Sequence, residues 1–220
     1  MRIRHHVNPL KLEFLVPRTP QVPIPPGKEV ELELGCADAQ FLFQRAAQDP
    51  GRVELGVEIR EDLVRDVNRR ARALGLNVKA IFANANVDLR FLLEPGTIAR
   101  IFVNFPDPWF KRRHRKRRVI DRDLIVACHE ALRPRGEFFF QSDVWDLALD
   151  AMSVIEAQEE RLENLAGPWS FWKEPNPYGA RSLREELNEQ EGKQIWRMLF
   201  RKRDEADEAI EGRARGIRAP

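Results

Sequence analysis

One aspartate of the sequence lies in a rigid turn next to a dense run of cations. Asp107 stands between two prolines and is flanked by the aromatic residues Phe105 and Trp109. Because prolines fix φ and donate no backbone hydrogen bond, this turn is a rigid mount for a carboxylate. Residues 111–118 follow, with seven lysines and arginines, one histidine and no acid. A fixed carboxylate beside such a strip predicts chemistry performed on a polyanion.

The cations of this strip repel one another unless an anion compensates them. Tracking a phosphate backbone is the commonest purpose of such a strip, and it makes binding depend steeply on salt. A solvated surface segment is the alternative. We therefore expect a nucleic acid partner, with phosphates contacted by Arg112, Arg113, Arg115, Lys116, Arg117 and Arg118.

Residues 31–41 read as a strand that runs into a turn at Gly35 and then into a helix. In open parallel sheets, a turn of this kind lets a ligand approach backbone amides at the carboxyl ends of the strands. Glu58 follows 23 residues after Gly35 and ends the next predicted strand. An acid at that distance can hold the ribose hydroxyls of a nucleotide-like cofactor. With a single glycine, a plain strand-to-helix turn is an equal alternative.

Two more polar residues follow predicted strands. Asn84 comes after 78–83 and could reach an adenine edge, although asparagine is also simply common in turns. Asp143 comes after 137–141, at the carboxyl edge where Asp107 is also expected. We expect both acids to face one crevice, and a solvated strand end is the alternative for Asp143.

The elements that must position these residues alternate between strands and helices. Runs typical of buried strands cover 30–34, 53–59, 78–83, 98–105, 137–141 and 195–200. Helical spacing covers 39–48, 61–74 with Gly75 as its cap, 122–132 and 144–165. This alternation predicts an α/β fold with a doubly wound, mostly parallel sheet.

The length of 220 residues suits one α/β domain with little left for a second. We expect an extended, Pro- and Arg-rich arm over 1–28, a single domain over 29–202 and a flexible charged tail over 203–220. The two cysteines fit neither a disulfide framework nor a zinc site, so we expect no metal and a reducing compartment. No apolar run reaches membrane-spanning length and no signal peptide is recognisable, which predicts a cytoplasmic protein with no membrane partner.

Together these segments resemble the bacterial tRNA (guanine-N7)-methyltransferase family, a class of S-adenosylmethionine-dependent, Rossmann-like enzymes. The similarity covers about 31–201 and is most specific in Asn-Phe-Pro-Asp-Pro-Trp at 104–109 with the cations that follow. It implies a seven-stranded methyltransferase sheet with an antiparallel C-terminal strand. It also implies methyl transfer from S-adenosylmethionine to N7 of a guanine in the variable loop of tRNA, by a monomer or homodimer.

The resemblance carries roles to individual positions. Asp107 would be the catalytic aspartate. The methyl donor would be contacted by Glu33, Gly35, Glu58, Asn84 and Asp107. The substrate guanosine region would be contacted by Lys111, Asp143, Ser182 and Glu185.

The sequence departs from the family pattern at a few positions. Ala37 and Ala39 stand where glycines are usual, Asn84 where an aspartate is common, and Arg184 where an aromatic residue is usual. These changes keep two other hypotheses open. One is a non-catalytic RNA-binding protein on a decayed methyltransferase fold, and the other is a methyltransferase acting on another RNA.

Overall fold

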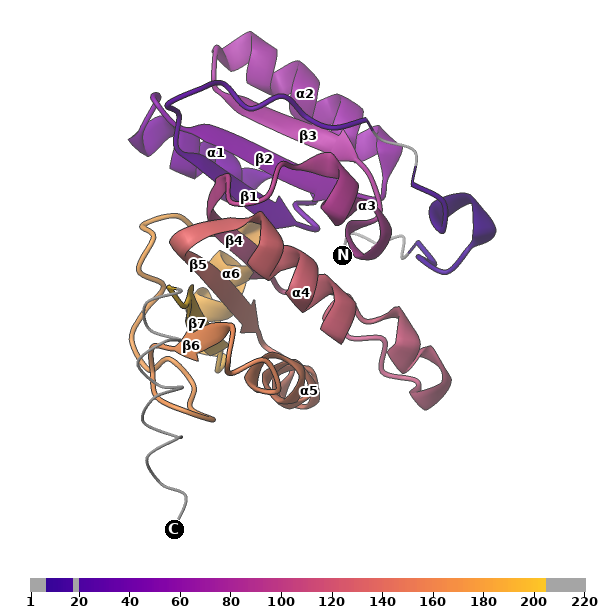
Figure 1. The fold of residues 1–220 in the computed structure, drawn as a ribbon, viewed down its shortest axis with the longest axis vertical. Coiled ribbons are helices and arrows are strands. Elements are labelled where there is room, and N and C mark those ends of the chain that lie inside the picture. Colours follow the sequence, from indigo (N-terminus) through magenta and orange to yellow (C-terminus); the bar gives the residue numbers. More distant parts are fainter. Residues whose placement is uncertain (1–6, 18–19, 205–220) are drawn as a thin grey trace.

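One seven-stranded sheet forms the centre of the molecule (Figure 1). The structure is a computed structural model, and we describe residues 7–17 and 20–204 of it, without the side chains of Arg112 and Arg115. The strands run in the order β3-β2-β1-β4-β5-β7-β6. They are β1 (Val30–Leu34), β2 (Val53–Glu58), β3 (Val78–Phe82), β4 (Ile98–Asn104), β5 (Leu132–Ser142), β6 (Leu162–Asn164) and β7 (Trp196–Lys202). Neighbours from β3 to β5 are parallel, whereas β7 is antiparallel to both β5 and β6. The predicted fold class is therefore confirmed.

Helices cover both faces of this sheet (Figure 1). They are α1 (Gln40–Gln48), α2 (Glu61–Leu74), α3 (Ala85–Leu92), α4 (Arg122–Ala131), α5 (Trp145–Glu156) and α6 (Leu183–Gln190). The apolar side chains of α3, α4 and α5 belong to one core cluster, and those of α1 and α2 belong to a second. β5 is apolar on both faces, as is typical of strands between two helical layers, whereas β1 and β2 carry buried glutamates on the face toward α1 and α2.

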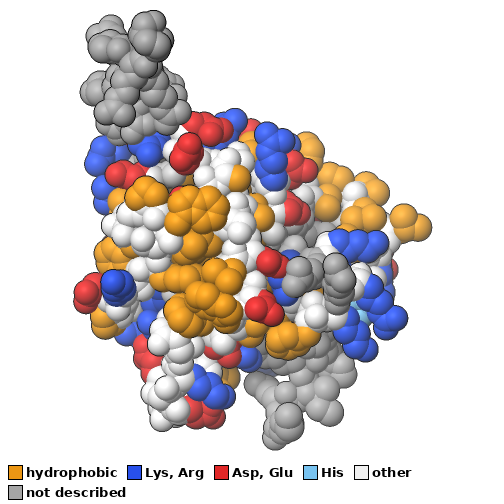
Figure 2. Space-filling model, turned by 90° about the horizontal axis from the view of Figure 1, so that it is seen from below, with side chains coloured by type: hydrophobic (Ala, Val, Ile, Leu, Met, Phe, Trp, Pro, Cys, Tyr) orange, Lys and Arg blue, Asp and Glu red, His pale blue; other side chains and the backbone are white. Residues whose placement is uncertain are grey.

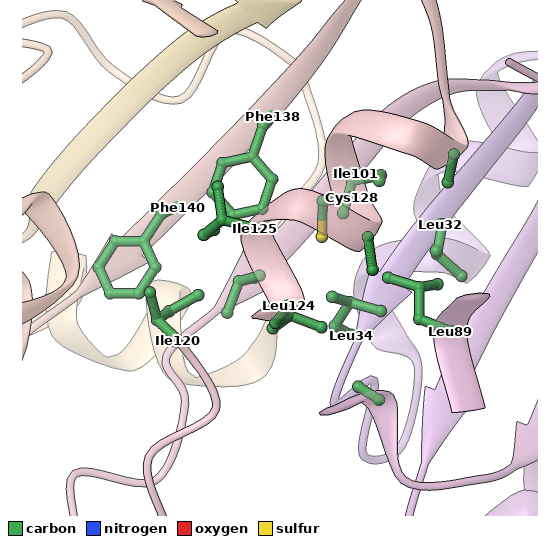
Figure 3. Packing of buried hydrophobic residues seen from close by; sticks show 14 of the residues in the cluster. Leu32, Leu34, Leu89, Ile101, Ile120, Leu124, Ile125, Cys128, Phe138 and Phe140 are labelled. Carbon is green, nitrogen blue, oxygen red and sulfur yellow. The ribbon is translucent and has the colours of Figure 1, made fainter. Parts of the chain in front are cut away.

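Three consecutive phenylalanines of β5 show how the two cores are separated. Phe138 and Phe140 pack with Ile125 and other residues of α4 on one face (Figure 3). Phe139 points to the other face, where its ring lies 5.2 Å from that of Tyr178. All three phenylalanines are fully buried, and each such burial stabilises the fold by about 1.5–3 kcal/mol.

The strand order reverses between β1 and β4, because the chain builds outward from β1 to β3 and then returns to pair β4 with β1. In doubly wound sheets, ligands bind outside the carboxyl ends of the strands at this switch point. The segments that follow β1, β2, β4 and β5 therefore frame the candidate site.

The structure differs from the sequence expectation after α5. The helix ends at Glu156 rather than near 165, and a short strand, β6, follows it. The buried carboxylate of Glu156 accepts hydrogen bonds from Asn164 Nδ2 and Trp169 N, which turns the chain back along the sheet. Helices α3 and α6 were not predicted, because each has only eight residues.

The N-terminal arm lies against the domain over its described residues. It contains a 3-10 turn, η1 (Leu12–Phe14), and the buried Val22 donates its backbone N–H to the carbonyl of Leu92 at 2.7 Å. The expected tail lies outside the described residues from 205 onward. Within 7–17 and 20–204, no helix is long and apolar enough to cross a membrane, and no cluster of His, Cys, Asp or Glu is placed to hold a metal ion.

Candidate active site at the carboxyl edge of the sheet

The turn after β1 binds directly to the end of β2. The N–H groups of Gly35 and Cys36 both donate to the carbonyl of Val57, at 2.7 and 3.2 Å. The N–H of Ala37 donates to Glu58 Oε2 at 2.9 Å. The turn packs so closely on β2 that a Cβ on Gly56 would lie 2.5 Å from Cys36 Sγ. These contacts place the backbone of the turn and the Glu58 carboxylate at the switch point.

Ala37 and Ala39 adopt the left-handed backbone conformation, with φ of 51° and 56°. The turn thus keeps a glycine-like shape although glycine is absent at both positions. For an L-residue this conformation costs about 1–2 kcal/mol, so the alanines store strain at the site.

Ala37→Gly should raise the free energy of unfolding by about 0.5–1 kcal/mol. Relief of the left-handed strain outweighs the larger backbone entropy that glycine has in the unfolded chain. Urea unfolding measures the difference, with Ala73→Gly on the exposed face of α2 as a matched control that should destabilise by up to about 1 kcal/mol. Equal destabilisation by both changes would contradict the strained turn.

Glu33 is a buried acid at the switch point. Its Oε1 accepts from Asn104 Nδ2 at 2.8 Å, whereas its Oε2 has no hydrogen-bond partner among the described residues. Burial raises the pKa of Glu33 from its ordinary 4.5 to about 8, and the nearby acids Asp38, Glu54 and Glu58 add to the effect. A buried carboxyl group with one oxygen unbound by the described residues thus lies near the end of β1, at the switch point.

Because folding raises the pKa of Glu33, its protonated form contributes to the free energy of unfolding. This contribution is complete below pH 4.5 and is lost as the pH rises through about 8. Glu33→Gln, which keeps an acceptor for Asn104, should therefore flatten the decline in the free energy of unfolding between these pH values. Denaturant unfolding at several pH values measures the slope. Glu61→Gln, at an exposed position, is the control and should leave the slope unchanged. Equal slopes for Glu33→Gln and the wild type would refute the link.

Arg60 connects the cofactor side of the crevice to Asp107. Its backbone N–H and its Nε both donate to Glu58 Oε1, at 3.0 and 2.9 Å, and its Nη2 donates to Glu58 Oε2 at 2.9 Å. The pKa of Arg60 is raised, mainly by the Glu58 hydrogen bond and more weakly by the charge of Asp107. Sequence reasoning missed Arg60, although its position two residues after Glu58, just past a predicted strand, was a usable signal.

The turn that carries Asp107 is braced on both sides. Phe105 and Trp109 hold left-handed backbones, with φ of 50° and 44°, and Phe105 is buried. Arg117 lies 5.0 Å from the centre of the Trp109 ring, and Arg118 Nε donates to the carbonyl of Pro108 at 2.9 Å. Asp107 itself is half-buried. The predicted rigid mount is therefore present, and part of the basic strip builds it.

The basic strip forms a 3-10 helix, η2 (Arg112–Arg117). Lys111, Arg113 and Lys116 are exposed. Arg118 is placed differently, because its side chain is only 8% exposed and is ion-paired to Asp150 of α5. Arg118 therefore holds the turn in place and does not contribute to the exposed cations.

Asn84 lies at the end of β3, and its polar atoms are bound within the protein. Its Oδ1 caps α3 by accepting from Asn86 N, and its Nδ2 donates to the carbonyls of Pro9 and Phe14 at 3.2 and 3.1 Å. The rings of Phe14 and Phe82 also meet edge to face, 6.3 Å apart. The N-terminal arm is thus fastened over this end of the sheet.

Three of the four residues expected near the substrate, Asp143, Ser182 and Glu185, lie around the start of α6. Asp143 forms a bidentate ion pair with Arg184, whose Nε donates to Oδ1 at 3.0 Å and whose Nη2 donates to Oδ2 at 2.6 Å. Ser182 caps α6 by accepting the N–H of Glu185 at 3.3 Å. Glu185 is fully buried. Its carboxylate is bound by Gln141, Asn176 and Arg197. In this structure Ser182 and Glu185 shape α6, and Asp143 and Ser182 are partly open to solvent whereas Glu185 is not.

A chain of buried hydrogen bonds joins the two sides of the crevice. Asn104 donates to Glu33, and Gln141 donates to both Asn104 and Glu185, at 2.8 to 2.9 Å. Asn104 and Gln141 end neighbouring strands and are paired in register. The acid below the cofactor turn is therefore connected to α6 through two amides that sequence reasoning did not single out.

Comparisons with known proteins agree with this geometry. A family model described as "Putative methyltransferase" matches residues 28–198. A protein of Microcystis aeruginosa named tRNA (guanine-N(7)-)-methyltransferase is 36% identical over 211 residues, covering 92% of this chain and 99% of that protein. One of the same name from Synechococcus elongatus is 37% identical over 214 residues, covering 91% of this chain and 96% of that protein. The solved structure of the 16S rRNA methyltransferase KamB has a similar fold, with a TM-score of 0.55 at 14% identity, over 80% of this chain and 89% of that one.

Proposed function

The chain belongs to the tRNA (guanine-N(7)-)-methyltransferase family, and we infer that it transfers a methyl group from S-adenosylmethionine to N7 of a guanine in tRNA. The observation that carries this inference is the position of Asp107. Its rigid turn lies at the carboxyl end of β4, in electrostatic reach of Arg60 and directly before the exposed cations of η2. An acid held between a cofactor crevice and an RNA-binding surface is placed for a reaction between the two ligands.

The residues at the ends of β1 and β2 and the turn after β1 fit a nucleoside cofactor that carries a cationic centre. Glu33 offers a buried carboxyl oxygen that no described residue binds. Glu58 ends β2, and its carboxylate would accept from ribose hydroxyls by exchanging hydrogen bonds that Arg60 now donates to it. The left-handed turn of 35–39 lets a ligand approach its backbone. When bound, S-adenosylmethionine supplies an electrophilic sulfonium methyl group. Asn84 stays a predicted contact, and it already holds the N-terminal arm over this end of the sheet.

Guanine N7 carries a lone pair and no proton, so the protein needs no general base to create the nucleophile. The tasks left for the side chains are alignment and charge stabilisation. Orientation of two bound reactants supplies up to ~7–11 kcal/mol in favourable cases. We assign Asp107 to holding the edge of the base and stabilising the positive charge that develops on the purine. Arg60 positions Asp107 relative to Glu58.

The exposed cations Lys111, Arg113 and Lys116 bind the phosphates of the tRNA, with selectivity from the overall shape of the RNA. Lys111, which directly precedes η2, lies nearest to Asp107 in the chain and contacts the target nucleotide. We place the target guanine in the variable loop. A tRNA substrate and two unpaired, buried cysteines both suit a reducing cytoplasm.

Calorimetric titration with S-adenosylmethionine separates this enzyme from a non-catalytic RNA-binding protein. We expect saturable binding of the cofactor in the range of about 1 μM to 1 mM that is usual for enzyme substrates. Absence of binding at about 1 mM would favour the non-catalytic alternative. A tRNA transcript with adenine in place of the variable-loop guanine should no longer accept the methyl group, and continued methylation would refute the assigned position.

A further inference from the structure

Three aromatic rings, one exposed and two partly buried, form a cluster beside the substrate end of the crevice. Trp145 begins α5, Trp196 begins β7, and Phe171 lies in the segment between β6 and α6. The ring centres are 4.3 Å apart for Trp145 and Trp196, 5.1 Å for Phe171 and Trp196, and 5.5 Å for Trp145 and Phe171. Trp145 is 44% exposed although it contacts both other rings. An indole is thus held in place by its neighbours with much of its surface open.

The strand register places this aromatic cluster at the carboxyl edge of β5. Trp196 pairs with Ser142, and Ser142 is followed directly by Asp143, the acid that we expect near the substrate. Trp145 is two residues further along the chain. The rings therefore flank the acceptor side of the crevice, which is opposite to the cofactor turn.

A hollow of about 360 Å³ adjoins the rings. Its size lies within the ~300–1,000 Å³ of typical small-molecule pockets. Phe171, Trp172 and Trp196 give it aromatic walls, and the exposed Lys173 adds a cation. Arg197 also lines the hollow, but its guanidinium is paired with Glu185 and Glu189. Aromatic faces and a cation are groups that recognise a nucleotide, through a stacked base and a phosphate.

The surroundings favour RNA over a second copy of this chain. Figure 2 shows hydrophobic side chains gathered near the middle of one face, with both cationic and acidic side chains around them. The rings adjoin the acceptor side of a site that acts on RNA, and the hollow beside them is lined by the exposed cation Lys173 and by no acid of the described residues. An indole with an open face binds an unstacked base without regard to sequence.

We propose that the cluster of Trp145, Phe171 and Trp196 is a stacking platform for an unpaired nucleotide of the tRNA next to the target guanine. The proposal rests on the function inferred above. A base stacked here holds its neighbour at the carboxyl edge of β5, so that the target guanine enters the crevice. Lys173, at the rim of the hollow, contacts the phosphate between the two nucleotides.

Trp145→Ala should weaken tRNA binding by about tenfold or more, as removal of one base–aromatic stack does. Binding of S-adenosylmethionine should not change, because the cofactor turn lies on the other side of the crevice. Trp145→Tyr, which keeps an aromatic face, should restore most of the affinity. Filter binding with tRNA and calorimetry with the cofactor measure the two constants. The matched control is Phe91→Ala on α3, which removes a 57% exposed aromatic ring remote from this site.

Unchanged tRNA affinity in Trp145→Ala would overturn the proposal. A second result would also overturn it: wild-type protein that sediments as a dimer, and Trp145→Ala that sediments as a monomer but binds tRNA equally well. The rings would then join two copies of the chain. Lys173→Gln, at an exposed position, should leave folding unchanged. It should make the slope of log tRNA affinity against log salt shallower by the amount expected for one lost phosphate contact. If the wild-type protein methylates no tRNA at all, the proposed function fails and not only the platform.

Discussion

Asp107→Asn should slow methyl transfer to tRNA by about 10²–10³-fold, the loss expected when one charge-stabilising group is removed from an active site. Asparagine keeps the size of the side chain and removes the charge that we expect to stabilise the developing positive charge on the purine. The turn itself should persist, because Arg118, Trp109 and the two prolines hold it. Single-turnover measurements with both substrates saturating isolate the chemical step from binding.

The control for this change is Asp62→Asn at the start of α2. Asp62 is exposed, and like Asp107 it raises the pKa of Arg60 through its charge. If the two variants lose activity equally, Asp107 acts only through Arg60. A wild-type transfer rate in a correctly folded Asp107→Asn protein would remove Asp107 from the mechanism altogether.

Neutralising the exposed cations of the basic strip should produce the second large effect. Lys111→Gln, Arg113→Gln and Lys116→Gln together should weaken tRNA binding by at least roughly tenfold at low salt. They should also make the slope of log affinity against log salt shallower by about 2–3, since each lost phosphate contact removes about 0.7–0.9. The thermal stability should stay close to that of the wild type, because these three side chains are exposed. Filter binding over a series of salt concentrations measures both quantities.

Three exposed arginines on α2 supply a charge-matched control: Arg65→Gln, Arg69→Gln and Arg72→Gln. The two triple variants have the same net charge, so only a local role of the strip predicts different salt slopes. Equal slopes in the two variants would mean that tRNA senses the total charge of the protein and not this surface.

The parts of the site that the sequence predicted are those built from neighbouring residues. The turn at Gly35 and the mount of Asp107 each depend on a few consecutive side chains, so residue types and spacing were sufficient to find them. The doubly wound sheet was predictable for a similar reason, because strands that are buried on both faces, such as the one ending in Phe138, Phe139 and Phe140, read as continuous apolar runs.

The parts that the sequence did not predict depend on residues far apart in the chain. Asn104 binds Glu33 across 71 residues and Gln141 across 37, so no local pattern contains this network. Arg118 looks like any other cation of the strip until Asp150, 32 residues later, is seen beside it. Glu185, given a substrate contact by resemblance, is enclosed by Gln141 and Arg197, which only the folding of β5 and β7 brings to it.

The central claim is that this chain places a methyl group on guanine N7 of tRNA with the help of Asp107. The most direct measurement is incubation of the wild-type protein and Asp107→Asn with unmodified total tRNA and labelled S-adenosylmethionine, followed by nucleoside mass spectrometry. We predict 7-methylguanosine as the labelled nucleoside with the wild type, and little or none in the same time with Asp107→Asn. Label in a different nucleoside, or no label from a wild-type protein that binds both substrates, would contradict the claim.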